Sequence, residues 1–205
     1  MDSQHPVSIS TDEAQDVAGS VRQAIRSLGD ARKDPQAWKW ALLALHSALQ
    51  GACVCHLTTT CPPIGAISKR DTEEWLTYLD ASRDDPNLRP PRTRLLELPD
   101  LVKRVRKDNS AGGPSAGYQI KISDAELSWI KHLHSEFRNQ FTHFAPMGWA
   151  IEVSGIPQFG ELVARILGDI HLAGYAFRHL DALDKNRLEQ DLHRLTTAAR
   201  SFAAS

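Results

Sequence analysis

The sequence predicts an all-α fold in the main, a helical bundle of five to seven helices with a small two-stranded β ribbon. Apolar residues recur at three- and four-residue spacing along most of the chain, capping signals precede these runs, and only two short segments alternate like β-strands. The 205 residues, 41% of them hydrophobic and 24% charged, suffice for one domain with a real core. We expect residues 1–9 to form a flexible N-terminal arm and residues 10–205 to form a single helical domain.

Two long helices are predicted in the N-terminal half. Ser10 followed by Glu13 matches a capping box, and the apolar periodicity after it ends at Gly29. Asp34-Pro35 is a strong helix start, because Asp suits the N-cap and Pro suits the first helical position. The helix from there to about Leu57 is apolar on most of its circumference, so we expect it at the centre of the bundle.

Shorter helices are predicted between the loops that follow. Residues 58–69 form a Pro- and Gly-containing loop, after which Asp71 caps a short helix. A second short helix starts near Pro99. Towards the C-terminus, Pro157 opens a helix that carries Phe159, Leu162, Ile166, Ile170 and Leu172, and a last helix runs from about Asp184 to Phe202.

The central helix of the C-terminal half begins at a second capping box, Ser123 with Glu126. Alternating segments at residues 118–122 and 149–153 flank it and are predicted to pair as the β ribbon. Pro146 ends the helix. Its apolar positions predict a buried stripe, made of Leu127, Ile130, Leu133, Phe137, Phe141 and Phe144.

The net charge of −1 excludes a protein that grips nucleic acid by bulk charge, so polyanion binding needs a local patch. Residues 89–107 are rich in arginine and lysine, and we take Arg104, Arg106 and Lys107 as candidate substrate-binding residues. The alternative for this segment is a solvated helix face and loop. The start has no signal-peptide pattern and no apolar run approaches about 20 residues, so we expect a cytoplasmic protein without a membrane partner.

Three cysteines, Cys53, Cys55 and Cys61, lie close to His46 and His56. Their Cys-x-Cys-x5-Cys spacing lacks the paired Cys-x2-Cys of structural zinc sites. An odd number of cysteines in a chain of intracellular character also argues against disulfides. We therefore interpret them as buried reduced thiols and predict neither a metal nor another cofactor.

One stretch of the central helix, residues 133–144, combines three groups that suit RNA chemistry. Arg138 offers a permanent fork of donors for a phosphate. His143 titrates near neutral pH and can take a proton from a 2′-hydroxyl or give one to a leaving oxygen. Asn139, four residues before His143 and on the same helical face, can orient the imidazole or hold a phosphate oxygen. We treat these three residues as the candidate catalytic set.

This stretch resembles the Arg-x4–6-His motif of the HEPN superfamily, in its common Arg-Asn-x3-His form. The resemblance implies a small helical bundle, a homodimer with a composite site, and metal-independent endoribonuclease activity on RNA. It also implies a toxin or defence role with a protein antitoxin or regulator as partner. Ala145 stands where HEPN toxins with a nucleotidyltransferase partner often carry tyrosine, so the resemblance does not extend to that partner. The alternative is a non-catalytic HEPN-like module that binds a nucleotide or a protein.

The loose form of the motif also occurs twice later, at Arg165-x5-His171 and Arg187-x5-His193. Only Arg138 is followed by asparagine and framed by an aromatic stripe, so we favour that copy. His132 and His134 alternate along the helix and point apart, and we interpret them as surface histidines.

Overall fold

Helices make up the regular structure, which confirms the predicted all-α class. The computed structural model describes residues 11–58, 61, 63–111, 119–138 and 152–203, with the backbone alone for residues 137–138. This part of the chain contains seven α-helices and one π-helical segment. Its one β feature is an isolated antiparallel bridge between Ile67 and Leu95. The predicted N-terminal arm, residues 1–9, lies outside it.

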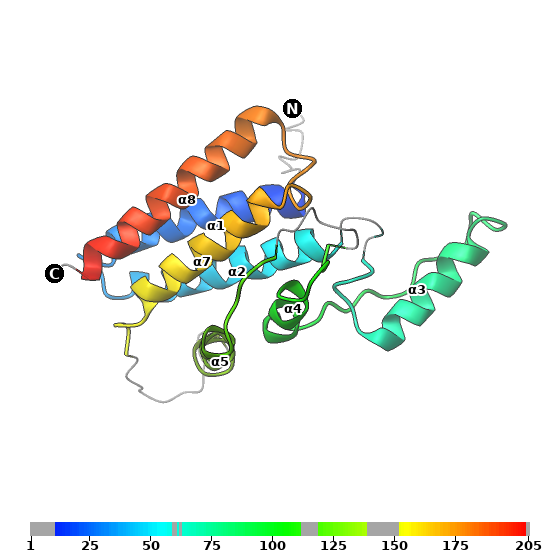
Figure 1. Ribbon diagram of the computed structural model, residues 1–205, viewed down its shortest axis with the longest axis horizontal. Helices are drawn as coiled ribbons and strands as arrows, with labels where there is room; N and C mark the ends of the chain where they lie inside the picture. The colour runs from blue at the N-terminus through cyan, green and yellow to red at the C-terminus, as the bar shows by residue number, and fades with distance from the viewer. Residues whose placement is uncertain (1–10, 59–60, 62, 112–118, 139–151, 204–205) are drawn as a thin grey trace, which may run out of the picture.

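Four long helices run side by side and form the bundle (Figure 1): α1 (Glu13–Asp30), α2 (Ala37–Leu57), α7 (Ile156–Leu172) and α8 (Ala182–Ala203). α2 contacts both α1 and α7, and α8 contacts the same two helices. The central position predicted for α2 is confirmed by side chains such as Leu45 and Leu49, which are fully buried. α2 is also long and apolar enough to cross a membrane, but 61% of the relevant window is buried inside the fold.

A second layer covers α2 and carries the candidate motif. It consists of α4 (Leu98–Val105), α5 (Asp124–His132) and the π-helical segment η1 (Leu133–Arg138). The capping box predicted for α5 is present, because the Ser123 hydroxyl accepts from the Glu126 backbone N–H and the Glu126 carboxylate accepts from the Ser123 backbone N–H. The caps and the buried apolar face of α4 and α5 fix the direction in which the chain enters the motif.

The short helix α3 (Lys69–Ala81) stands away from the rest of the molecule (Figure 1). None of its residues is buried. At its base, the Ile67–Leu95 bridge and a 2.9 Å hydrogen bond from the Leu96 N–H to the Ala66 carbonyl join the segments before and after it to each other, and Arg104 of α4 donates to the Gly65 carbonyl at 2.7 Å. Residues 68–95, which we call the arm, therefore project from a fixed base.

Three helix starts differ from the prediction. α2 begins at Ala37 with Gln36 as its N-cap residue and not at Asp34-Pro35; the Asp34 carboxylate instead accepts from the Gln36 N–H at 2.9 Å in the turn before the helix. α1 is capped by Asp12, whose carboxylate accepts from the Gln15 N–H at 2.8 Å; Ser10 lies outside the described residues. α3 is capped by Ser68 and contains Asp71 in its first turn. Asp and Ser are equally good N-caps, so the residue type does not show which of two neighbouring candidates caps the helix. The position at which the backbone enters the helix decides it.

One further prediction was wrong in part. Residues 119–123 form no strand, although Ile120 and Ile122 are buried, and residues 149–151 of the second predicted strand lie outside the described residues. Leu172 belongs to α7 as predicted and is 68% exposed because it is the last residue of the helix. The predicted ribbon is thus absent from residues 119–123, where burial of the isoleucines against helices replaces strand pairing.

Candidate functional site

The motif begins where α5 changes its winding. α5 ends at His132, and residues 133–138 continue as η1 with the wider turn of a π-helix. Such segments are rare and are found often at functional sites. Arg138 is the last residue of η1, and its side chain, together with Asn139 and His143, lies outside the described residues. The arrangement of the three candidate catalytic groups is therefore an expectation from the sequence.

A buried pair of histidines lies one turn before Arg138. His46 Nε2 of α2 and His134 Nδ1 of η1 are 2.9 Å apart, and their rings stack with an interplanar angle of 18°. His46 is 9% exposed and His134 is 8% exposed. The prediction that His134 is a surface residue was wrong, because it follows Leu127 and Ile130 on the buried face of the helix.

A carboxylate continues this pair towards the surface. Glu97 Oε2, at the start of α4, is 3.6 Å from His134 Nε2, and the Glu97 side chain is 79% exposed. Because a carboxylate only accepts, a proton on His134 Nε2 suits this contact and leaves Nδ1 as the acceptor for an N–H from His46. One tautomer of each ring thus allows the hydrogen bond between His46 and His134 and turns the second N–H of His134 towards the Glu97 carboxylate.

His46, the inner residue of the histidine pair, borders a pocket of about 720 Å³. His46 forms part of its wall, beside apolar residues such as Leu43 and Val54. The start of α1 supplies three carboxylates to the same lining, Asp12, Glu13 and Asp16. Their negative charge repels a phosphate backbone, so this pocket favours a cationic or neutral group over RNA.

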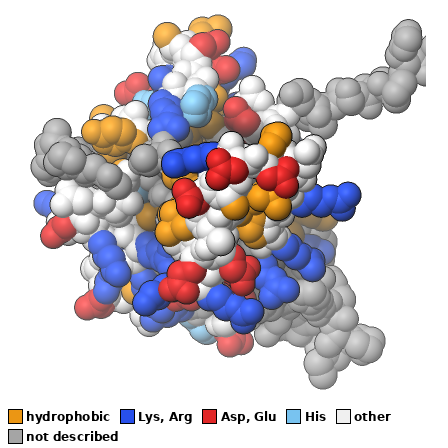
Figure 2. All heavy atoms as spheres, turned by 90° about the vertical axis from the view of Figure 1, so that its right-hand side faces the viewer, with side chains coloured by type: hydrophobic (Ala, Val, Ile, Leu, Met, Phe, Trp, Pro, Cys, Tyr) orange, Lys and Arg blue, Asp and Glu red, His pale blue; other side chains and the backbone are white. Residues whose placement is uncertain are grey.

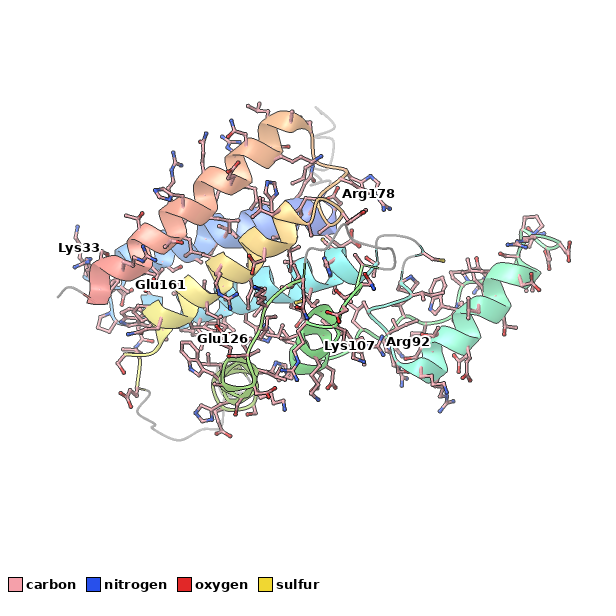
Figure 3. All side chains as sticks on the ribbon, in the orientation of Figure 1. Lys33, Arg92, Lys107, Glu126, Glu161 and Arg178 are labelled. Carbon is pink, nitrogen blue, oxygen red and sulfur yellow. The ribbon has the colours of Figure 1, made fainter. Side chains whose placement is uncertain are left out.

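The candidate substrate-binding residues of the basic segment have different partners. Arg104 donates to the Gly65 carbonyl at 2.7 Å, and Arg106 donates to the Asp124 carboxylate at 2.6 Å. The hydrogen bond from Arg106 and its charge lower the pKa of Asp124. Lys107, labelled in Figure 3, is exposed and makes no ion pair with any residue the structure describes. Of the three, Lys107 is the side chain most available to a ligand.

The two other matches to the loose motif occupy less suitable surroundings. Arg165 donates to the Lys121 carbonyl and the Glu126 carboxylate, each at 2.7 Å, and lies 3.3 Å from Asp169. A phosphate would have to displace these groups, so the arginine of this match is already committed. His193, from the last match, is exposed on α8.

The cysteines and their neighbouring histidine carry no metal-like cluster. Cys53 and Cys55 are buried and free, and Cys61 is half-buried and free. Burial raises the pKa of the Cys53 thiol well above its usual range, and burial with the charges of Glu13 and Asp12 raises the pKa of Cys55 to about 12. Neutral thiols are poor nucleophiles and poor metal ligands. No group of three metal-ligating side chains occurs in the described ranges. The predicted burial holds for Cys53 and Cys55 but not for Cys61.

His56 is a buried base without charge. Its Nε2 is 2.8 Å from the Ser110 hydroxyl, which itself donates to the Val105 carbonyl at 2.8 Å. Nε2 therefore carries the proton and donates to Ser110. Burial lowers the pKa of His56 to about 4, and this side chain holds the end of α2 against the segment after α4.

Comparison of the chain with protein-family models, with curated proteins and with solved structures finds no match. The resemblance to the HEPN superfamily therefore stands on the residues 138–143 and on the helical architecture. Sequence reasoning missed the His46–His134 pair, although two signals were present. His46 interrupts the apolar run of α2, and His134 falls seven residues after Leu127, in step with the buried stripe.

Proposed function

We propose that this protein is a metal-independent endoribonuclease of the HEPN type, cytoplasmic and homodimeric, with Arg138, Asn139 and His143 at its catalytic centre. The observation that carries the proposal is that the arginine of the Arg-Asn-x3-His motif, Arg138, is the last residue of a π-helical segment that a buried histidine pair ties to the core helix. Rigid attachment of a catalytic segment favours precise placement of its reacting groups. An antitoxin or regulator protein is the partner that the same resemblance suggests.

The proposed chemistry is an internal attack within RNA. The ribose 2′-oxygen forms a bond to the adjacent phosphorus, the bond from phosphorus to the 5′-oxygen breaks, and the products are a 2′,3′-cyclic phosphate and a 5′-hydroxyl. One His143 accepts the 2′-hydroxyl proton and a second His143, from the other subunit, protonates the leaving 5′-oxygen. Arg138 stabilises the charge that gathers on the phosphate oxygens, and Asn139 orients the imidazole.

The test is RNA cleavage in the presence of EDTA, with the 2′,3′-cyclic phosphate as the diagnostic product. His143→Ala is expected to lower the cleavage rate by roughly 10²–10⁴-fold, the usual contribution of positioned proton transfer. Arg138→Ala is expected to weaken RNA binding and also to lower the cleavage rate. The matched control is His193→Ala, which removes an exposed histidine of a competing motif match and is expected to keep full activity. Equal cleavage by wild type and His143→Ala would remove the proposal.

A non-catalytic binding module is the second candidate, and the pocket beside His46 favours it. Its volume of about 720 Å³ is that of a small-ligand site. The lining of Asp12, Glu13 and Asp16 suits a cationic ligand or peptide side chain. For this candidate, purified protein cleaves no RNA, whereas a cationic ligand raises the melting temperature of wild type more than that of Asp16→Asn.

A further inference from the structure

The arm, residues 68–95, has no cover within the described part of its own chain. α3 has 13 residues and none of them is buried. A helix of this length is marginal on its own in water, because helices in proteins take most of their stability from burying one face. The N-cap of α3 at Ser68 stabilises the helix by less than burial of an apolar face stabilises the other helices.

The arm also exposes apolar side chains. Leu76 is 53% exposed, Leu88 is 40% exposed and Leu95 is 45% exposed. Trp75 lies against Tyr78 with ring centroids 5.6 Å apart, and its indole Nε1 is covered without an acceptor among the described residues. Figure 2, which faces the side from which the arm projects, shows hydrophobic side chains exposed among acidic and basic ones. Such a surface fits a protein interface with a polar rim.

The two halves of the arm differ in net charge. Residues 69–85 hold six acidic side chains and three basic ones, Lys69, Arg70 and Arg83, whereas the charged side chains of residues 86–95 are all arginines. The acidic side chains lie on α3 and at the tip, within residues 71–85. The returning segment carries Arg89, Arg92 and Arg94, all exposed, and none of the three makes an ion pair with a described residue. The acidic half has only local partners among the described residues, Arg70 with Glu74 at 3.5 Å and Arg83 with Asp80 at 3.6 Å. The arm is therefore complementary in charge to a second copy of itself.

We propose that the arm is a homodimerisation element that pairs with the arm of a second copy. In a two-fold interface, one surface meets its own copy, so residues 71–85 of each chain face the arginines at 89–94 of the other. Leu76 and Leu88 lie in the apolar centre of the contact. Binding to a different protein would not require the same arm to carry both an acidic half and an arginine-rich half, whereas pairing with a second copy does.

The base of the arm makes the pairing relevant to the whole molecule. The Ile67–Leu95 bridge closes the base of the arm, and the hydrogen bond from Arg104 to the Gly65 carbonyl at 2.7 Å holds this base to α4. Two paired arms therefore fix the distance between two bundles. The pairing requires no ribonuclease activity, and its test is separate from the cleavage assay.

The first experiment measures mass by sedimentation over a dilution series up to about 100 µM, well above the micromolar constants of weak dimers. Wild type is expected to be a dimer, and Leu76→Glu is expected to dissociate at least about tenfold more readily, since a charge enters the apolar centre. Leu183→Glu changes a leucine that is 75% exposed on α8 and is expected to stay dimeric. A monomeric wild type, or a dimer that Leu76→Glu does not weaken, overturns the proposal.

A charge exchange tests the complementarity itself. One variant carries Glu73→Lys and Glu74→Lys, and the other carries Arg89→Glu, Arg92→Glu and Arg94→Glu. Each variant alone is expected to be monomeric because like charges meet, and an equimolar mixture is expected to form heterodimers. Circular dichroism confirms that both variants keep their helices. Failure of the mixture to associate overturns the arrangement, even if each variant alone is monomeric.

Discussion

The imidazoles of His46 and His134 are joined by a 2.9 Å hydrogen bond between α2 and η1, and both residues are buried. The bond connects the central helix of the bundle to the segment that ends at Arg138. A buried imidazole pair needs one donor and one acceptor, so this contact holds only while at least one ring is neutral. The direction in which the motif leaves the bundle thus depends on two side chains 88 positions apart.

The losses of unfolding free energy on replacing His46 and His134 singly are expected to add up to more than the loss on replacing both together. His134→Leu leaves His46 Nε2 without this partner inside the fold, and loss of one partner in a buried hydrogen bond costs about 1–3 kcal/mol. The double variant His46→Leu/His134→Leu removes both polar groups together. We expect its loss of unfolding free energy in urea to fall below the sum of the single losses by about 1 kcal/mol.

The control for this cycle is His193→Leu, at an exposed position of α8. Its unfolding free energy is expected to stay within about 0.5 kcal/mol of wild type. Strictly additive losses for the His46 and His134 variants would contradict a direct bond between the two rings.

His56 gives the fold a defined pH dependence. Its pKa is about 4 in the folded chain, against 6.5 for the free side chain, so the unfolded chain binds the proton more readily. Stability from His56 is therefore complete above pH 6.5 and falls as the pH drops from 6.5 towards 4. The loss across that window is on the order of 3 kcal/mol.

His56→Gln tests this assignment, because the Gln amide can donate to Ser110 as His56 Nε2 does and has no titration in this range. The unfolding free energy of the variant, measured in urea between pH 7 and pH 4, is expected to decline less steeply than that of wild type. Parallel curves for the two proteins would show that another group causes the decline.

The helices could be predicted from the sequence because their signals are local. The capping box of Ser123 and Glu126, the Pro near the start of α4 and the apolar run of α2 each act within a few residues. The partners of buried polar groups could not be predicted in this way. His46 meets His134 only after two distant helices pack, and Arg104 finds the Gly65 carbonyl across 39 positions.

The candidate site was predicted only in its residue types. Periodicity places Asn139 and His143 on one helical face, but the change from α to π winding at Leu133 alters the angle between successive residues. A pattern analysed with 3.6 residues per turn has no signal for that change. His134 was missed for a different reason. It was assigned from its alternation with His132, although helical spacing of four from Ile130 and seven from Leu127 places it on the buried face.

In the basic segment, Arg104 and Arg106 bind groups of the protein itself, whereas Lys107 is the residue on which the prediction of substrate binding can be tested. Arg104→Ala removes the partly buried hydrogen bond to Gly65 and is expected to lower the unfolding free energy by about 1 kcal/mol. Lys107→Ala is expected to leave stability unchanged and to weaken RNA binding, with the salt dependence of the binding constant reduced by about one ion. Filter binding at several salt concentrations measures the second effect. Equal RNA affinity for Lys107→Ala and wild type would show that Lys107 does not bind RNA and would favour the alternative of a solvated helix face and loop.

Two glycines are expected to respond to the same substitution with opposite signs. Gly65 has a φ of +106°, and a Cβ there would lie 2.0 Å from the Leu57 carbonyl oxygen. Gly65→Ala is therefore expected to lower the unfolding free energy by at least about 2 kcal/mol, because neither the backbone angle nor the contact can be kept. Gly19 lies inside α1, where an added methyl group would meet no atom of another element within 4 Å, and Gly19→Ala is expected to raise stability by about 0.5–1 kcal/mol. Thermal unfolding of the two variants measures both effects, and a tolerated Gly65→Ala would contradict the close approach of this turn to the end of α2.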